Sequence, residues 1–147
     1  MRINTRFPVA THTLAVIALT QGRPCTSELI AKSVNTNPVV VRRIISQLKK
    51  AGLVQVLPAA GGTRLVRAPE GITLLDIYNA VKTIEDAALF DVHPNPNPKC
   101  YIGANIHKAL ESPLATAQQA MEEQLGQVSL AEVMAPIAEA GPRVQAG

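Results

Sequence analysis

The sequence predicts a mainly α-helical fold that carries one small β-hairpin, and three observations indicate it. A short helical segment and a turn lead into a basic amphipathic segment over residues 38–51. Two β-branched runs follow directly, and apolar residues then return at helical spacing over residues 103–128. With 147 residues, 47% hydrophobic and 17% charged, the chain is expected to form one main core rather than two full domains.

Charge divides the chain into two unequal halves. Residues 1–67 carry ten Lys or Arg against one acid, Glu28, whereas residues 68–147 carry four bases against ten acids. A basic half with almost no acid is expected of a module that binds a polyanion, and the acidic half would stay away from it. Charge alone also leaves open a basic face that is merely solvated.

The first two helices are predicted from their composition and termini. Apolar residues lie all round the segment 5–20, as they do in a buried helix. Residues 21–24 contain Gly and Pro and predict a turn. Thr26 can then cap a short helix that runs through Val34.

The third helix has the sharpest signals. Asn37 is a favoured N-cap, Pro38 suits the first helical position, and the helix should run to Ala51 with Gly52 as its C-cap. At 100° per residue one face is apolar and packs, while the other is polar and cationic. A helix of this kind after a helix and a turn predicts a DNA-reading helix, although a basic surface helix is the alternative. The polar face holds Val39, Arg42, Arg43, Ser46, Gln47, Lys49 and Lys50.

Two strands and a final set of elements complete the predicted order. Residues 53–57 and 63–67 form a hairpin around Gly61-Gly62, a wing on which Arg64 and Arg67 place charge and whose glycines could approach a phosphate. A capping-box helix follows over residues 73–84, then an extended Pro-Asn loop over 93–100. A short helix over 129–138 and a tail from Gly141 end the chain.

The segment 103–128 predicts a helix about 38 Å long, whereas the basic module should have a radius of gyration near 12 Å. The far half of this helix therefore needs another surface, and a second copy of the chain is the simplest supplier. The competing interpretation folds the helix back at Pro113. The predicted dimerisation stripe consists of Ile106, Leu110, Ala117, Met121, Leu125 and Val128.

Together, Asn37-Pro38, Ala51-Gly52-Leu53-Val54, Gly61-Gly62 and the segment from Ile72 to Tyr78 make the chain resemble the Rrf2 family of bacterial winged helix-turn-helix regulators, over about residues 2–137. The resemblance implies a homodimer joined through a long helix. It also implies which residues face DNA. Lys49 is added to the predicted DNA-binding residues because it lies on the polar face of the third helix. The implied residues are Thr26, Ser27, Asn37, Val39, Arg42, Arg43, Ser46, Gly62, Thr63 and Arg64.

Members of that family that bind an iron-sulfur cluster place three cysteines before the long helix, where this chain has only Cys100. Such a cluster normally needs four thiolates, so we expect no cluster and no other cofactor. Cys100, His93 and His107 could in principle hold a single metal ion, but structural or solvent-facing roles are the expectation. Cys100 is a conceivable redox sensor, and an idle thiol is the better prediction.

The sequence therefore predicts a dimeric, sequence-specific DNA-binding regulator, most simply a repressor on a palindromic operator. No nucleophile motif, phosphate loop or metalloprotease motif indicates an enzyme. No signal peptide or membrane span is recognised, so a cytoplasmic location is expected. Residues 1–84 would form the DNA-binding domain, 85–102 a connecting loop, 103–139 the dimerisation helices and 140–147 a tail. A winged-helix module that binds an acidic protein, or a redox- or metal-responsive regulator using Cys100, are the alternatives.

Overall fold

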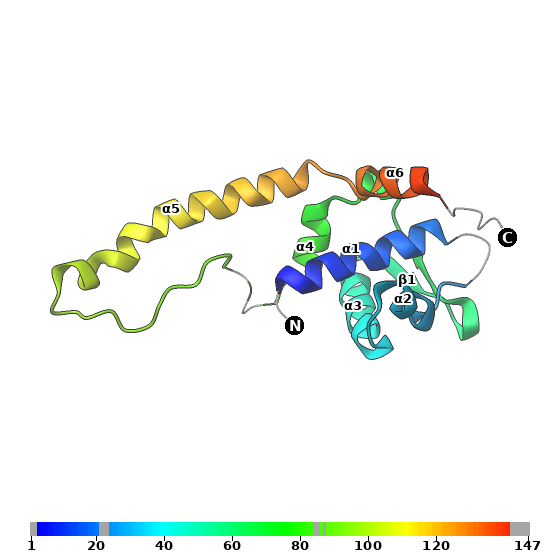
Figure 1. Cartoon of the computed structure of the whole chain (residues 1–147), viewed down its shortest axis with the longest axis horizontal. Coiled ribbons are helices and arrows are strands. Elements are labelled where there is room, and N and C mark those ends of the chain that lie inside the picture. Colours follow the sequence, from blue (N-terminus) through cyan, green and yellow to red (C-terminus); the bar gives the residue numbers. More distant parts are fainter. Residues whose placement is uncertain (1–2, 21–23, 84–85, 87, 142–147) are drawn as a thin grey trace.

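The computed structural model describes residues 3–20, 24–83, 86 and 88–141. Within these residues, five helices and a hairpin form a compact body, and one long helix extends away from it (Figure 1). The elements are α1 (Ile3–Leu19), α2 (Ser27–Val34), α3 (Pro38–Lys50), β1 (Val54–Val56), β2 (Thr63–Leu65), α4 (Leu74–Val81), α5 (Tyr101–Gly126) and α6 (Leu130–Ala140), with 3-10 turns at Ala59–Gly61 and Pro69–Gly71. The predicted mainly helical class with one small hairpin is confirmed.

The caps of α2 and α3 are those predicted from the sequence. The Thr26 hydroxyl accepts a hydrogen bond from the Leu29 N–H at 3.2 Å, and the Asn37 side chain accepts one from the Val39 N–H at 2.8 Å. Asn35 ends α2 in the left-handed region, at φ 64°. Helix α3 ends at Lys50, one residue earlier than predicted, and Gly52 follows with φ 77°. The predicted turn over 21–24 lies mostly outside the described residues.

The core lies where α1, α3, α4 and the hairpin meet. Its fully buried side chains include Leu14 of α1, Ile30 of α2, Leu48 of α3 and Ile77 of α4. Thr13 is also buried, and its hydroxyl donates to the Val9 carbonyl at 2.8 Å, which satisfies it inside α1. Helix α1 thus lies mainly in the core, as predicted, but the prediction of burial all round is wrong on one side, where Pro8, His12 and Leu19 are exposed.

The hairpin is shorter than predicted and is held against the rest of the domain. Strands β1 and β2 pair antiparallel with Gln55 opposite Arg64. Gly62, at φ 74°, forms a bridge with Cys25, and the Thr63 N–H donates to the Cys25 carbonyl at 2.9 Å. These contacts fix the wing next to the start of α2.

Helices α4 and α6 begin side by side. The Thr73 hydroxyl and the Asp76 carboxylate form the predicted capping box at α4, and Ser129 caps α6 by accepting from the Glu132 N–H. Thr73 and Ser129 form an antiparallel bridge. Helix α4 ends at Val81 rather than at the predicted residue 84, which lies outside the described residues.

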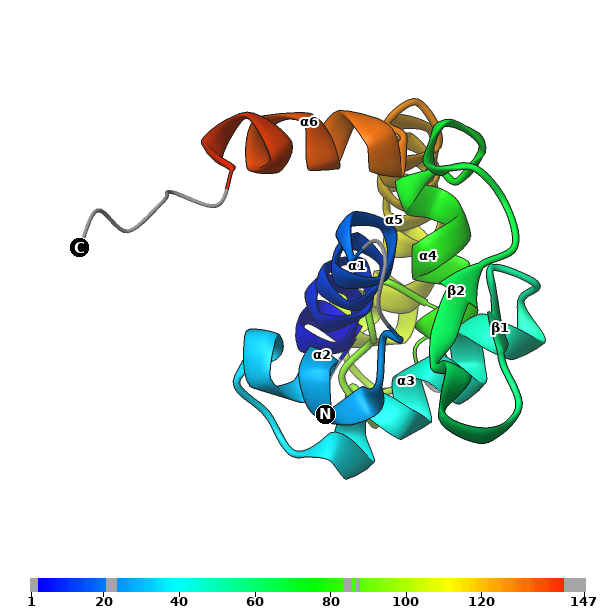
Figure 2. The same cartoon turned by 90° about the vertical axis from the view of Figure 1, so that its right-hand side faces the viewer.

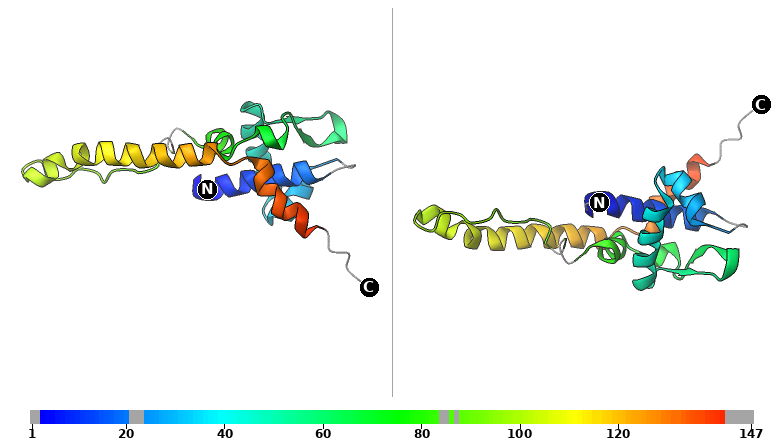
Figure 3. Two further views of the ribbon diagram at one scale, coloured as in Figure 1. Left: turned by 90° about the horizontal axis from the view of Figure 1, so that it is seen from above. Right: turned by 90° about the horizontal axis from the view of Figure 1, so that it is seen from below.

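Helix α5 runs unbroken over 26 residues and projects beyond the domain, as Figures 1 and 3 show. Pro113 lies inside it on an exposed side, so the interpretation that folded the chain back at Pro113 is wrong. A proline there removes one backbone hydrogen bond, and the carbonyl it leaves can be solvated on that side. Among the described helices, none has the length and apolar character needed to cross a bilayer.

Candidate nucleic-acid interface

The exposed face of α3 is basic. Its inner side buries Val41, Ile44, Ile45 and Leu48 in the core. Figure 2 shows α2 and α3 at the edge of the domain opposite α6, so this face is not covered by the C-terminal helix. Val40 lies outside the polar set predicted from the sequence, yet it is only half-buried. The outer side exposes Val39, Arg42, Arg43, Ser46, Lys49 and Lys50.

The residues that precede α2 and α3 were also predicted to face DNA. Asn37 is exposed, while Thr26 and Ser27 are half-buried. The side chains of Thr26 and Asn37 already accept backbone hydrogen bonds as caps. The structure therefore gives both residues a local role that is independent of any ligand.

Arg42 has a partner on α2. Its Nη2 donates to Oε1 of Glu28 at 3.0 Å, and both side chains are largely exposed. The backbone N–H of Glu28 and then Arg42 hold the pKa of this carboxyl below its ordinary value, which keeps it anionic. Sequence reasoning missed this pair, although Glu28 stood out as the one acid among residues 1–67.

Two of the three wing residues predicted to face DNA are packed against or buried within the protein itself. A Cβ on Gly62 would lie 2.6 Å from both the N and the O of Cys25, so this glycine allows contact with the protein's own backbone. Thr63 is buried and offers no side chain to a ligand. Arg64 is exposed, with its guanidinium against the Gln55 amide across the hairpin.

Other basic residues are engaged within the protein. Arg67 donates to the Gly71 carbonyl and to Asp76, so it holds the wing to α4. Arg6 donates to the Val81 carbonyl at 2.9 Å and to Asp86 at 2.8 Å. In contrast, for Arg43 and Lys49 the described part of the chain provides no hydrogen-bonding or ionic partner.

The segment after α4 lies close to α3. Thr83 and then Arg6 lower the pKa of Asp86 by hydrogen bonding its carboxylate, which ties this segment to α1. A cavity of about 420 Å³ lies between α1, α3 and this segment. Its lining residues are Arg6, Val40, Arg43, Ile44, Ser46, Gln47 and Thr83.

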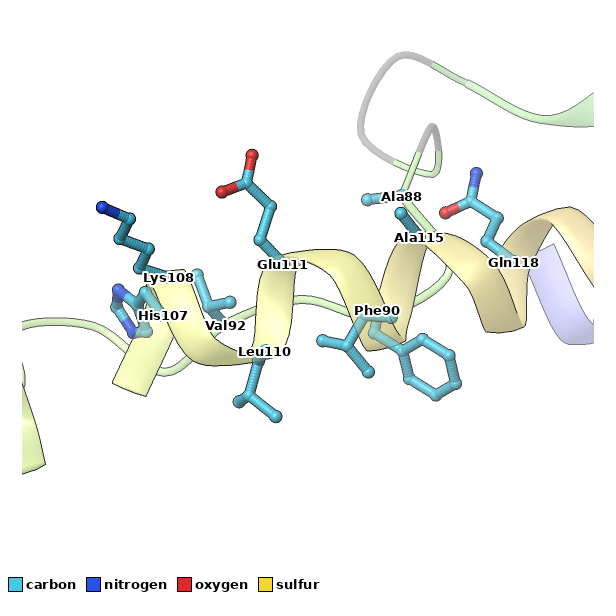
Figure 4. Close-up of a pocket in the computed structure, with 10 residues that line it drawn as sticks. Ala88, Phe90, Val92, His107, Lys108, Leu110, Glu111, Ala115 and Gln118 are labelled. Atoms are coloured by element: carbon cyan, nitrogen blue, oxygen red, sulfur yellow. The ribbon is translucent and has the colours of Figure 1, made fainter. Parts of the chain in front are cut away.

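The predicted dimerisation stripe is incompletely covered. No described residue of α5 is buried. Ala117 is exposed, and the other stripe residues are half-buried. The segment 88–93 runs along α5, where the Leu89 N–H donates to Gln118 and His107 contacts the His93 carbonyl at 3.0 Å. An open groove of about 480 Å³ lies there, and Figure 4 shows Phe90, Val92 and Leu110 along it.

Cys100 and Cys25 lie in different environments. Cys100 is exposed at the start of α5, where the N–H groups of Gly103 and then Ile102 lower the pKa of its thiol. Cys25 is buried in the core. Within the described ranges, no group of three or more His, Cys, Asp or Glu is arranged to hold a metal ion. One accessible thiol per chain does not fit an iron-sulfur cluster, which normally takes four.

A basic helix exposed beside a two-stranded wing, on a helical core, defines a winged helix-turn-helix DNA-binding protein. A family model described as an iron-dependent transcriptional regulator, Rrf2, matches residues 3–136. The chain belongs to the Rrf2 family of transcriptional regulators, and it is a regulator rather than an enzyme.

Individual relatives agree with this assignment. The Bacillus subtilis protein YwnA, described as an HTH-type transcriptional regulator, is 47% identical over 132 residues, which cover 90% of this chain and 96% of YwnA. A crystal structure of a protein described as DNA-binding is 41% identical, with a TM-score of 0.72 over 88% of this chain and 98% of that one. The IscR structure from T. potens shares the fold, at 23% identity and a TM-score of 0.69 over 97% of this chain and 92% of IscR.

Proposed function

We propose that this regulator binds a palindromic operator as a homodimer and represses transcription by occupying the promoter. The exposed basic face of α3 carries the proposal, because a groove-reading helix needs side chains for base edges and cations for phosphates. In this proposal residues 1–84 bind DNA in the bacterial cytoplasm and residues 103–139 join the two subunits.

Dimerisation through α5 is supported by its length and its exposure. A helix of 26 residues is about 39 Å long, and it contacts its own domain mainly through α4. At its far end Tyr101 is 81% exposed and Ile102 58% exposed. Apolar surface of this kind favours association. A twofold axis there would present two α3 helices to half-sites about 34–36 Å apart.

DNA binding is tested by fluorescence anisotropy with the duplex upstream of the chain's own gene, over a range of salt concentrations. Arg43→Ala should weaken binding and reduce the slope of log affinity against log salt by about one if Arg43 contacts a phosphate. Lys108→Ala is the matched control, because it removes the same charge from α5, away from α3. Equal effects of both substitutions, or none, would refute the assignment of the α3 face.

We further propose that the regulator acts without an iron-sulfur cluster. The donor set supports this, because Cys25 is buried in the core and only Cys100 is accessible. Protein purified without oxygen should be colourless. A brown preparation with stoichiometric iron and sulfide would overturn this proposal, and Cys100 and His107 would then be the first ligands to test.

A further inference from the structure

Glu28 occupies an unexpected place for a carboxylate. It is the one acid among residues 1–67, against ten bases, and it lies in the first turn of α2 next to the exposed face of α3. A carboxylate there would be repelled by DNA phosphates. The α2 and α3 helices thus place a negative charge on the surface that the proposed function brings against a polyanion.

The contact with Glu28 restricts the orientation of the Arg42 side chain but uses only one of its N–H groups. The Nη2–Oε1 distance is 3.0 Å, and the Arg42 side chain remains 56% exposed. A guanidinium has five N–H donors in a fixed plane, so one contact leaves a further edge available. That edge can donate two hydrogen bonds to O6 and N7 of a guanine. Arg43, on the neighbouring position of α3, has no such partner in the described part of the chain.

We infer that Glu28 is a positioning residue that determines specificity: it holds the Arg42 guanidinium in the orientation that reads a guanine in the major groove. This inference rests on the proposed function, in which α3 contacts DNA. An arginine free to rotate can move to a nearby phosphate, and there it contributes affinity for any sequence. Because Glu28 holds Arg42 and repels phosphates, it lowers the affinity for DNA of any sequence and raises the preference for one base pair.

Removal of the Glu28 carboxylate should raise the affinity for arbitrary DNA and lower the specificity for the operator. Glu28→Ala should bind an arbitrary duplex several-fold more tightly, because one negative charge is removed from the DNA-facing surface. Its preference for guanine at one operator position should fall about tenfold, within the range that a bidentate arginine contact supplies. Glu28→Gln should show the same gain in general affinity and a smaller loss of preference, because its amide oxygen can still accept from Arg42.

The experiment selects bound duplexes from a randomised pool with the wild-type chain, the two Glu28 variants and Arg42→Ala, and compares base preferences position by position. Glu70→Gln is the matched control, since Glu70 is an exposed acid outside the basic half. We expect Glu28→Ala and Arg42→Ala to lose preference at the same base pair, and their combination to lose no more than Arg42→Ala alone. Circular dichroism verifies that each variant is folded.

Three results would overturn the inference. Unchanged base preferences in Glu28→Ala would mean that Glu28 repels DNA phosphates but does not orient Arg42. A loss at a different base pair from that of Arg42→Ala would mean that Glu28 contacts a base itself. A wild-type chain that selects no consensus would refute sequence-specific binding, and therefore the proposed function as well as this inference.

Discussion

Gly62 offers a test that separates two explanations for the glycine pair in the wing. If the glycine exists for close approach to DNA, Gly62→Ala should weaken binding and leave the fold intact. The structure instead predicts that Gly62→Ala mainly destabilises the fold. An added Cβ would lie 2.6 Å from Cys25 N and O and 2.8 Å from its carbonyl carbon, and these are backbone atoms that cannot rotate away.

The expected cost follows from the geometry. Gly62 has φ 74° and ψ −155°, a region in which any other residue costs about 1–3 kcal/mol. The hairpin would also have to move away from Cys25, which breaks the hydrogen bond from the Thr63 N–H to the Cys25 carbonyl, worth about 1 kcal/mol. A total of about 2–4 kcal/mol corresponds to a fall in Tm of about 5–15 °C for a chain of this size.

Two other glycines serve as matched controls in urea and thermal unfolding. Gly52 has φ 77° with nothing near its Cβ position, so Gly52→Ala should cost only the backbone strain, about 1–2 kcal/mol. Gly71 has open space and no positive φ, so Gly71→Ala should be nearly neutral. A Gly62→Ala protein as stable as Gly71→Ala, with only DNA binding reduced, would refute the packing explanation.

Three further predictions address the dimer, the Arg6 contact and the exposed thiol. Glu substitutions at both Met121 and Leu125 should give monomers in sedimentation and abolish tight operator binding, since two charges cannot be buried in an apolar interface without large cost. The pKa of Asp86 is lowered in the folded state, so its contribution to stability is present above about pH 4 and is lost as the pH falls through the lower folded value. Asp86→Asn should therefore weaken the dependence of urea unfolding on pH in that acid range. Cys100 should react with a maleimide at pH 7 while folded Cys25 does not, because Cys100 is exposed with a lowered pKa.

The predictions on the dimer, Asp86 and Cys100 are each checked by a control or a contradicting result. Ser112→Glu with Thr116→Glu adds the same two charges on the exposed opposite side of α5 and should remain dimeric; a monomeric wild type would contradict the dimer directly. Asp91→Asn removes an exposed carboxylate that, among the described residues, accepts only from the neighbouring Val92 N–H, and it should leave the acid dependence unchanged. Rapid modification of both thiols in the native protein would contradict the burial of Cys25.

Local features of this protein were determined by sequence alone. Asn37 and Pro38 begin α3, Thr73 and Asp76 form a capping box, and Ser129 begins α6, as predicted. Each of these signals acts within one helical turn, so neighbouring residues suffice to specify it. The amphipathic character of α3 was equally local, because its period is a property of the helix.

Which side chains are available for function depends on how the helices and strands pack. Gly62 contacts Cys25, Arg42 contacts Glu28, and Arg6 contacts Asp86. None of these pairs has a sequence spacing that reveals it, since each depends on how separate helices and strands pack. The same packing buries Thr63 and leaves Arg43 exposed. A pattern along the chain determines which face of an element is polar, but the polar residues that remain free for a partner are determined by what the rest of the fold places beside them.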